Sequence, residues 1–181
     1  MKWLIASDIH GSAYYCQKLV EVYKNEKADK LLLLGDLLYH GPRNDLPQAY
    51  DPKKVLKMLN DIKCEILCVK GNCDGDVDQM VLEFPILAEY AIISNDKNII
   101  FATHGHKINV EHPPALKKGD ILLYGHTHIP KCEKYDEFTY LNPGSVSIPK
   151  EDSVHSYMTF DGKMFEWKKL LDGNTYMRHT L

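Results

Sequence analysis

The stretch Leu31-Leu32-Leu33-Leu34-Gly35-Asp36 decides the fold class of this chain of 181 residues. Four consecutive leucines without polar alternation predict a strand that is buried on both faces, which is typical of the sheets of α/β proteins. Gly35 allows a sharp turn after the strand, and Asp36 then stands beyond its carboxyl end, where such sheets bind ligands. We therefore expect Asp36 to face a ligand site.

The residues on either side of this stretch predict further strands, with helices between them. Apolar runs at residues 3–6 and 65–69 predict two further buried strands. Helices are expected between the strands, at residues 13–26 after the capping residue Ser12 and from the capping residue Asp51 onwards. This order predicts parallel strands joined by right-handed crossovers.

The second half of the chain is richer in strands than in helices. The expected strands there are residues 90–94 and 98–103 (a hairpin turning at Asn95-Asp96-Lys97), 121–124, 139–141, and 156–160 and 164–167 (a hairpin turning at Asp161-Gly162). Two strand-rich halves with helices between them predict an α/β fold, a four-layer α-β-β-α sandwich of two mixed sheets flanked by helices. Because the sequence contains no linker, repeat or low-complexity segment, residues 1–181 are expected to form one domain.

Composition narrows the function classes. A formal net charge of −3 gives no reason to expect nucleic-acid binding, although a local site could still hold a small anion. The five cysteines are odd in number and lack the spacing of a disulfide scaffold, so we expect reduced thiols and a cytoplasmic protein. Cys64 and Cys68 are expected to be core thiols of one strand. No signal peptide is expected, and no apolar stretch reaches the roughly 20 residues of a membrane span.

Potential metal ligands follow the ends of five apolar runs. They are Asp8, His10, Asp36, Asn72, His104, His126 and His128. Imidazole, carboxylate and carboxamide groups together suit divalent ions such as Mn²⁺, Fe²⁺ or Zn²⁺. Seven ligands exceed the needs of one ion, so they predict two ions, with Asp36 as the candidate that bridges them. Such a pair can clamp a phosphoryl group and activate a water.

These residues lie in blocks that resemble the signature of the calcineurin-like metallophosphoesterases. The blocks are Asp8-Ile9-His10, Gly35-Asp36, Gly71-Asn72-Cys73-Asp74, Thr103-His104-Gly105-His106 and Gly125-His126-Thr127-His128. Residues 35–44 and 142–150 resemble the YfcE-type phosphodiesterase branch of that family in particular. The resemblance implies one metal on Asp8, His10, Asp36 and His128, and another on Asp36, Asn72, His104 and His126. It also implies hydrolysis of a phosphodiester by attack of a metal-bound hydroxide on phosphorus. Mn²⁺ is the first expectation for both ions, with Zn²⁺, Fe²⁺ or Ni²⁺ as alternatives.

One position departs from the wider family. Many members carry His directly after the Asn of the third block, where this chain has Cys73. A thiol is a much weaker cation surrogate than an imidazolium, which favours diesters over the more highly charged monoesters. The predicted catalytic residues are Asp36, Asn72, His104, Cys73 and Asp74, although Cys73 could equally be a small packing residue.

Three further residues are predicted to contact substrate. His40 and Arg43 lie on a polar loop, and either phosphate binding or ordinary solvation explains them. His106 is expected to face phosphate or to support a ligand.

Two other functions stay open at this stage, together with the partners. A phosphomonoesterase would use the same ions, whereas a scaffold similar to a retromer subunit would not need all seven ligands. The expected partner is a small phosphodiester substrate, with no membrane and no nucleic acid. A homodimer or a higher homo-oligomer is a further expectation from the resemblance.

Overall fold

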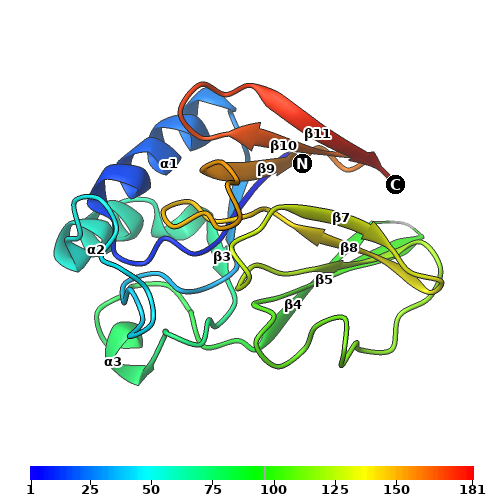
Figure 1. Cartoon of the computed structure of the whole chain (residues 1–181), viewed down its shortest axis with the longest axis horizontal. Helices are drawn as coiled ribbons and strands as arrows, with labels where there is room; N and C mark the ends of the chain where they lie inside the picture. The colour runs from blue at the N-terminus through cyan, green and yellow to red at the C-terminus, as the bar shows by residue number, and fades with distance from the viewer. Residues whose placement is uncertain (96) are drawn as a thin grey trace.

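The computed structural model describes residues 1–95 and 97–181, and these form two stacked sheets with helices on one side (Figure 1). The first sheet has the strand order β11-β10-β9-β1-β2-β3. Its strands are β1 (Trp3–Ala6), β2 (Lys30–Leu33), β3 (Ile66–Cys68), β9 (Ser156–Phe160), β10 (Met164–Lys169) and β11 (Thr175–Thr180). The second sheet has the order β4-β5-β6-β8-β7. Its strands are β4 (Tyr90–Asn95), β5 (Asn98–Thr103), β6 (Asp120–Leu123), β7 (Lys131–Lys134) and β8 (Phe138–Asn142).

The four leucines at the centre of the first sheet are fully buried, as predicted. Strands β1, β2 and β3 pair in parallel, and β9 joins β1 antiparallel. Leu31 and Leu33 pack in the core beneath α1 (Ala13–Asn25) and α2 (Pro52–Asn60). Leu32 and Leu34 instead pack in the core between the two sheets. The absence of polar alternation in this strand therefore reflects two apolar layers, one on each face.

The second sheet is mixed as well. Strands β5, β6 and β8 are parallel, whereas β4 and β7 pair antiparallel at the two edges. Its outer face carries a smaller aromatic cluster that includes Tyr124 and Tyr140, and Ile108, Val110 and Leu116 pack against this cluster. The prediction of two mixed sheets flanked by helices is thus confirmed. In the described residues, however, a loop covers this outer face where the predicted α-β-β-α order had a helix layer.

Several local details differ from the predictions. Strands β7 and β11 and the short helix α3 (Asp76–Gln79) were not expected. A 3₁₀ turn, Lys63–Glu65, precedes β3, so Cys64 is exposed and the prediction of a core thiol there was wrong, whereas Cys68 is buried. The predicted turn at Asn95-Asp96-Lys97 includes Asp96, which lies outside the described residues.

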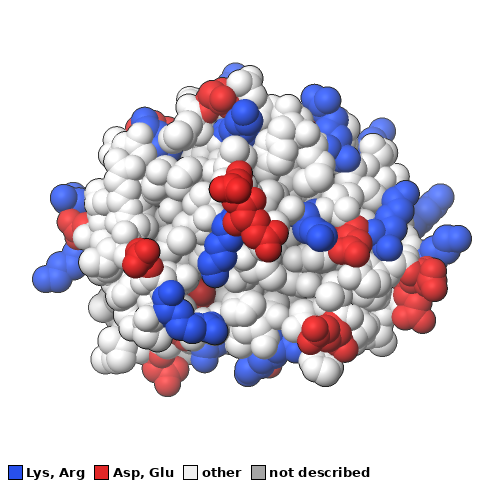
Figure 2. Space-filling model, viewed as in Figure 1, with Lys and Arg blue, Asp and Glu red and all other residues white. Residues whose placement is uncertain are grey.

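The surface that faces the viewer carries both signs of charge, interspersed rather than segregated (Figure 2). Within the described part of the chain, no helix combines the length and the apolar character needed to cross a membrane.

Candidate metal centre

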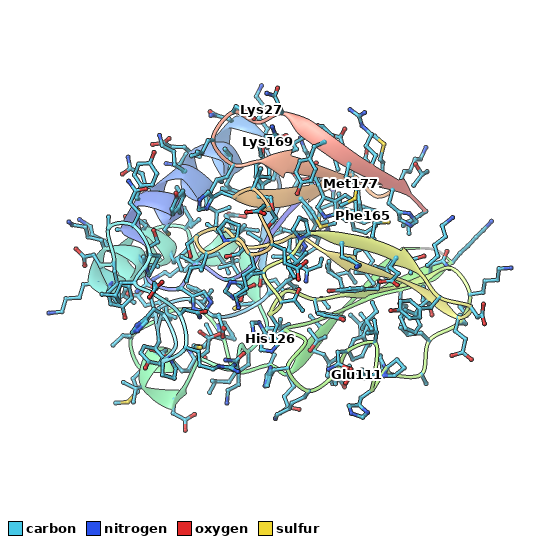
Figure 3. The ribbon with its side chains drawn as sticks, in the orientation of Figure 1. Lys27, Glu111, His126, Phe165, Lys169 and Met177 are labelled. Atoms are coloured by element: carbon cyan, nitrogen blue, oxygen red, sulfur yellow. The ribbon has the colours of Figure 1, made fainter. Side chains whose placement is uncertain are left out.

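The seven predicted ligands come from loops at the carboxyl ends of strands in both sheets. In the first sheet, Asp8 and His10 follow β1, Asp36 follows β2 and Asn72 follows β3; in the second, His104 follows β5, and His126 and His128 follow β6. His126 lies between the loops of the two sheets (Figure 3), and its backbone N–H donates to Asp8 Oδ2 at 3.1 Å. The structure therefore brings residues from both halves of the chain to one place.

The backbone at this place is unusual. Five of the seven candidate ligands have a positive φ, namely Asp8 (59°), His10 (49°), Asp36 (57°), His126 (63°) and His128 (64°). Residues other than glycine rarely adopt this left-handed conformation, and such residues cluster at functional sites. The backbone conformation thus sets most of the candidate ligands apart from the strands that precede them.

Asp8, His10 and His128 form the first group of ligands. Their ligand atoms lie within 4.8 Å of one another, and all three residues are buried. Asp8 Oδ1 lies 3.3 Å from His128 Nε2 and 3.6 Å from His10 Nε2. Asp8 Oδ1 is also a buried oxygen without a hydrogen-bond partner among the described residues.

The hydrogen bonds and the spacing of the two imidazoles in this group show whether a cation fits between them. His10 donates its Nδ1–H to the Tyr39 carbonyl at 2.8 Å, and His128 donates its Nδ1–H to the Ile148 carbonyl at 2.6 Å. In the neutral rings both Nε2 atoms then carry lone pairs, and these atoms lie 3.2 Å apart. Neighbouring nitrogen ligands of one tetrahedral ion, with bonds of about 2.0–2.1 Å, lie about 3.3 Å apart. A divalent cation thus fits this donor set.

Asn72, His104 and His126 form the second group. His104 donates its Nδ1–H to the Leu34 carbonyl at 2.6 Å, so its Nε2 faces Asn72 Oδ1 at 3.0 Å and His126 Nδ1 at 3.2 Å. In the neutral state His104 Nε2 and Asn72 Oδ1 are both acceptors, and His126 can present the lone pair of its Nδ1 to the same place. The second group therefore suits a cation for the same reason.

Asp36 lies between the two groups. Its Oδ2 is 3.6 Å from His10 Nε2 in the first group and 3.4 Å from His104 Nε2 in the second. Its Oδ1 accepts a hydrogen bond from the Cys73 backbone N–H at 2.8 Å. One carboxylate oxygen thus faces both groups of ligands at once.

The pKa values of the candidate ligands are shifted because carboxylates and imidazoles lie close together at the centre. Burial alone would raise the pKa of Asp8, but the imidazoles of His10 and His128 outweigh it and hold that pKa well below its usual value. Burial opposes protonation of His104, yet Asp36 and Asp8 raise its pKa to about 9. Burial and the nearby His104 lower the pKa of His126 to about 4. Negative charge at the centre therefore attracts positive charge, which a divalent ion can supply.

A cavity of about 410 Å³ opens beside these groups. Besides ligands it is lined by Gly41, Pro42, Arg43, Asn44, Cys73, Thr127 and Lys150. Arg43 and Lys150 are exposed cations without an ion-pair partner among the described residues. Lys150 was not among the predicted site residues, although it ends the block of residues 142–150 that carries the resemblance to the YfcE-type branch.

Apart from the candidate metal ligands, three predicted site residues lie outside the lining of this cavity. Asp74 is buried behind Asp36, where its carboxylate accepts the backbone N–H groups of Asp36, Leu37 and Gly71 at 2.8–2.9 Å. The ring of His40 packs edge-on against those of Tyr39 and Tyr50. His106 lies beside His104, and burial lowers its pKa.

Comparison with known proteins agrees with this geometry. A family model described as the calcineurin-like phosphoesterase superfamily domain matches residues 1–164. Phosphodiesterase YfcE of Escherichia coli is 47% identical over 161 residues, covering 89% of this chain and 88% of that protein. A solved structure of the E. coli phosphoesterase superposes with a TM-score of 0.96 at 43% identity, covering 99% of both chains. A Vps29 from Entamoeba histolytica, at 23% identity and a TM-score of 0.65 over 100% of this chain and 99% of its own, shares the fold alone.

Proposed function

This chain belongs to the calcineurin-like phosphoesterase superfamily, and we propose from that premise that it is a metal-dependent phosphoric diester hydrolase acting on small phosphodiesters. The observation that carries the proposal is Asp36 Oδ2, which faces a ligand group on either side. A carboxylate in that position can join two cations, and two cations suit phosphoryl transfer.

We propose two divalent ions, most simply Mn²⁺, with Zn²⁺, Fe²⁺ or Ni²⁺ as alternatives. Asp8, His10 and His128 would hold one ion, Asn72, His104 and His126 the other, and Asp36 both. When bound, such ions neutralise phosphoryl oxygens and lower the pKa of a coordinated water.

The protein's own residues would bind and orient the substrate. Arg43 and Lys150 line the cavity beside the ligands and can attract an anionic phosphate. Burial and the nearby Asp36 raise the pKa of the Cys73 thiol, so Cys73 stays neutral and adds no positive charge. Asp74 acts as a positioning residue, because its carboxylate is occupied by three backbone N–H groups. We also propose that His40 and His106 contact the substrate at the rim of the site.

A direct test is hydrolysis of bis(p-nitrophenyl) phosphate with added Mn²⁺. Asp36→Asn and His126→Ala each remove one ligand, and we expect each to lower kcat/KM by at least about 100-fold. Glu137→Gln, which changes an exposed carboxylate on the turn before β8, should leave the rate unchanged. Wild-type rates in both ligand variants would overturn the proposal.

Phosphomonoester hydrolysis is the second candidate, and one observation favours it. Arg43 and Lys150 could offset the extra charge of a monoester even though Cys73 cannot. Comparing bis(p-nitrophenyl) phosphate with p-nitrophenyl phosphate keeps the leaving group constant. We expect the diester to be hydrolysed faster. A scaffold function is disfavoured because every ligand position is filled.

Three further points are part of the proposal. We propose that residues 1–181 act as one metallophosphoesterase domain and that the protein works in the cytoplasm with reduced thiols. We also propose a homodimer or a higher homo-oligomer, which size-exclusion chromatography with light scattering can test. Nucleic acid is not an expected substrate, given the net charge of −3.

A further inference from the structure

The block of residues 142–150 stood out in the sequence, yet only its last residue, Lys150, lines the cavity. We infer that this block is a support for Asp8 and His128, which sets the affinity of one ion site independently of the other. The inference rests on the proposed two-ion function and adds Ser145 and Ser147 as positioning residues.

Two hydroxyl groups of the block converge on the backbone of Asp8. Ser145 Oγ donates to the Asp8 carbonyl at 2.9 Å, and Ser147 Oγ donates to the same carbonyl at 3.0 Å. Both serines are buried, and Asp8 has a φ of 59°. Since a non-glycine residue adopts this conformation only when its surroundings enforce it, the two bonds on the carbonyl have a clear physical role.

Ser145 is itself held firmly. Its Oγ accepts the backbone N–H of Ile148 at 2.9 Å and of Ser147 at 3.2 Å while its hydrogen points at Asp8. The Val146 N–H also donates to the Ser7 carbonyl at 3.0 Å. The hydroxyl therefore has both acceptor sites and its donor in use, which leaves it one orientation.

Residues 142–150 also hold His128, which belongs to the same group of ligands as Asp8. The Ile148 carbonyl accepts the Nδ1–H of His128 at 2.6 Å, which fixes the ring and turns Nε2 toward Asp8. The Lys150 N–H donates to the His128 carbonyl at 3.3 Å. Thus Asp8 and His128, which come from different sheets, are joined through one short segment.

The other group is supported elsewhere. His104 donates to the Leu34 carbonyl, and the loops that carry Asp36 and Asn72 are tied together by Asp74 through Asp36 N and Gly71 N. Asn142 donates to the Gly125 carbonyl at 2.8 Å and to Thr127 Oγ1 at 3.0 Å, so it supports the loop that carries His126 of one group and His128 of the other. Among the described ligand residues, Ser145 and Ser147 hydrogen-bond to Asp8 alone, and the second group is hydrogen-bonded to Asp8 only through the His126 backbone N–H. These two serines are therefore the residues to change.

The experiment compares Mn²⁺ binding to wild type and to the double variant Ser145→Ala/Ser147→Ala by isothermal titration. Partners that orient metal ligands typically change affinity 10–100-fold, so we expect one binding step to weaken by about that factor and the other to stay unchanged. Electron paramagnetic resonance gives a second readout. Wild type at full loading should show a spin-coupled Mn²⁺ pair, and the variant at equal Mn²⁺ should show isolated Mn²⁺.

Ser156→Ala is the matched control. Ser156 is buried, and its Oγ donates to the Pro143 carbonyl of the same block at 2.6 Å, so the control deletes the same kind of bond without touching Asp8. It should bind Mn²⁺ like wild type. Ser147→Thr keeps a hydroxyl and should restore most of the affinity lost in Ser147→Ala. Circular dichroism checks that each variant folds, and the single variants replace the double one if it does not.

The outcomes separate this inference from the proposed function. Wild type that binds fewer than two ions contradicts the two-ion function itself. Wild type with two ions and a double variant with two unchanged steps, or with both steps weakened alike, overturns the inference. An effect of Ser156→Ala equal to that of the double variant also overturns it. In an Asn72→Ala background, which removes a ligand of the other group, the double variant should lose its remaining tight ion.

Discussion

Two positions beside the candidate metal centre require glycine because a larger residue would overlap its neighbours, and not only because of the backbone conformation. An added Cβ on Gly71 would overlap the Oδ1 and backbone N of Asp36, although the φ of Gly71 lies outside the left-handed region. A Cβ on Gly35 would overlap the backbone N of Gly71. The loops after β2 and β3 therefore touch backbone to backbone, and this close approach places Asp36 beside Asn72.

Gly71→Ala should displace Asp36 and lower kcat/KM by about 100-fold or more, because displacements of about 1 Å can have that effect. The Mn²⁺ content after dialysis should fall in parallel. Gly75→Ala is the matched control, since its Cβ would meet only Asp78 Oδ2 at 3.8 Å. If Gly71→Ala keeps wild-type activity and metal content, the loops have more freedom than the structure indicates.

At the residue scale, sequence predicts ligand identity better than ligand orientation. The spacing of Asp8 with His10 and of His126 with His128 identifies the candidate ligands. It does not reveal that His104 faces the centre with Nε2, because the carbonyl that holds its Nδ1–H belongs to Leu34, far along the chain. Nor does it reveal that His126 presents Nδ1 to His104. It also could not place Asp74 behind the site, because Asp74 differs from a ligand only in accepting three N–H groups.

At the scale of elements, the carboxyl end of α1 is joined to the first sheet by one partly buried carboxylate. Glu26 accepts hydrogen bonds from Lys168 Nζ at 2.7 Å, Tyr157 OH at 2.9 Å and Lys2 Nζ at 2.7 Å. Burial would raise the pKa of Glu26, but the two lysines and the tyrosine lower it to about 2. This contact connects α1 to the strands on which Asp8 depends.

Glu26→Gln should lower the free energy of unfolding by about 1–2 kcal/mol at pH 7, allowing for partial screening by solvent. The folded-state pKa lies below the ordinary value of 4.5, so the contribution is complete above about pH 4.5. It disappears as the pH falls toward about 2, where both states are protonated. Urea unfolding at pH 7 and pH 3 should therefore give a smaller difference between variant and wild type at pH 3.

Glu21→Gln is the control for this prediction, because its partner Lys18 is on the same exposed helix surface. It should show no measurable change at either pH. A Glu26→Gln difference that is independent of pH would contradict the role assigned to the Glu26 charge.

Elements with strong apolar runs were predictable, and two edge strands with exposed residues, β7 and β11, were not. Leu31 to Leu34 fill two cores, so hydrophobicity alone identifies their strand. Strand β7 reads Lys-Cys-Glu-Lys and is exposed on most residues, because an edge strand needs charge rather than burial. Such a strand is defined by its pairing with β8, which a local pattern does not contain.

At the scale of the whole molecule, the candidate centre lies where the two sheets meet. Residues such as Phe165 and Met177 fill the space between the sheets (Figure 3). Asp8, His10, Asp36 and Asn72 approach from the first sheet, and His104, His126 and His128 from the second. Ions held by both sets would join the sheets at this edge, so ion binding and global stability should be linked.

Removing the ions should therefore lower the melting temperature. A ligand that binds only the folded state adds about 2.7 kcal/mol at a concentration of 100 times Kd. For a chain of this size that corresponds to about 5–10 °C in Tm. Differential scanning calorimetry with excess Mn²⁺ and with a chelator measures the shift. In Asp36→Asn the shift should be much smaller, because Asp36 faces both ligand groups. Wild type that melts at one temperature with and without its ions, once metal analysis has confirmed their removal, would show that the centre does not join the two sheets.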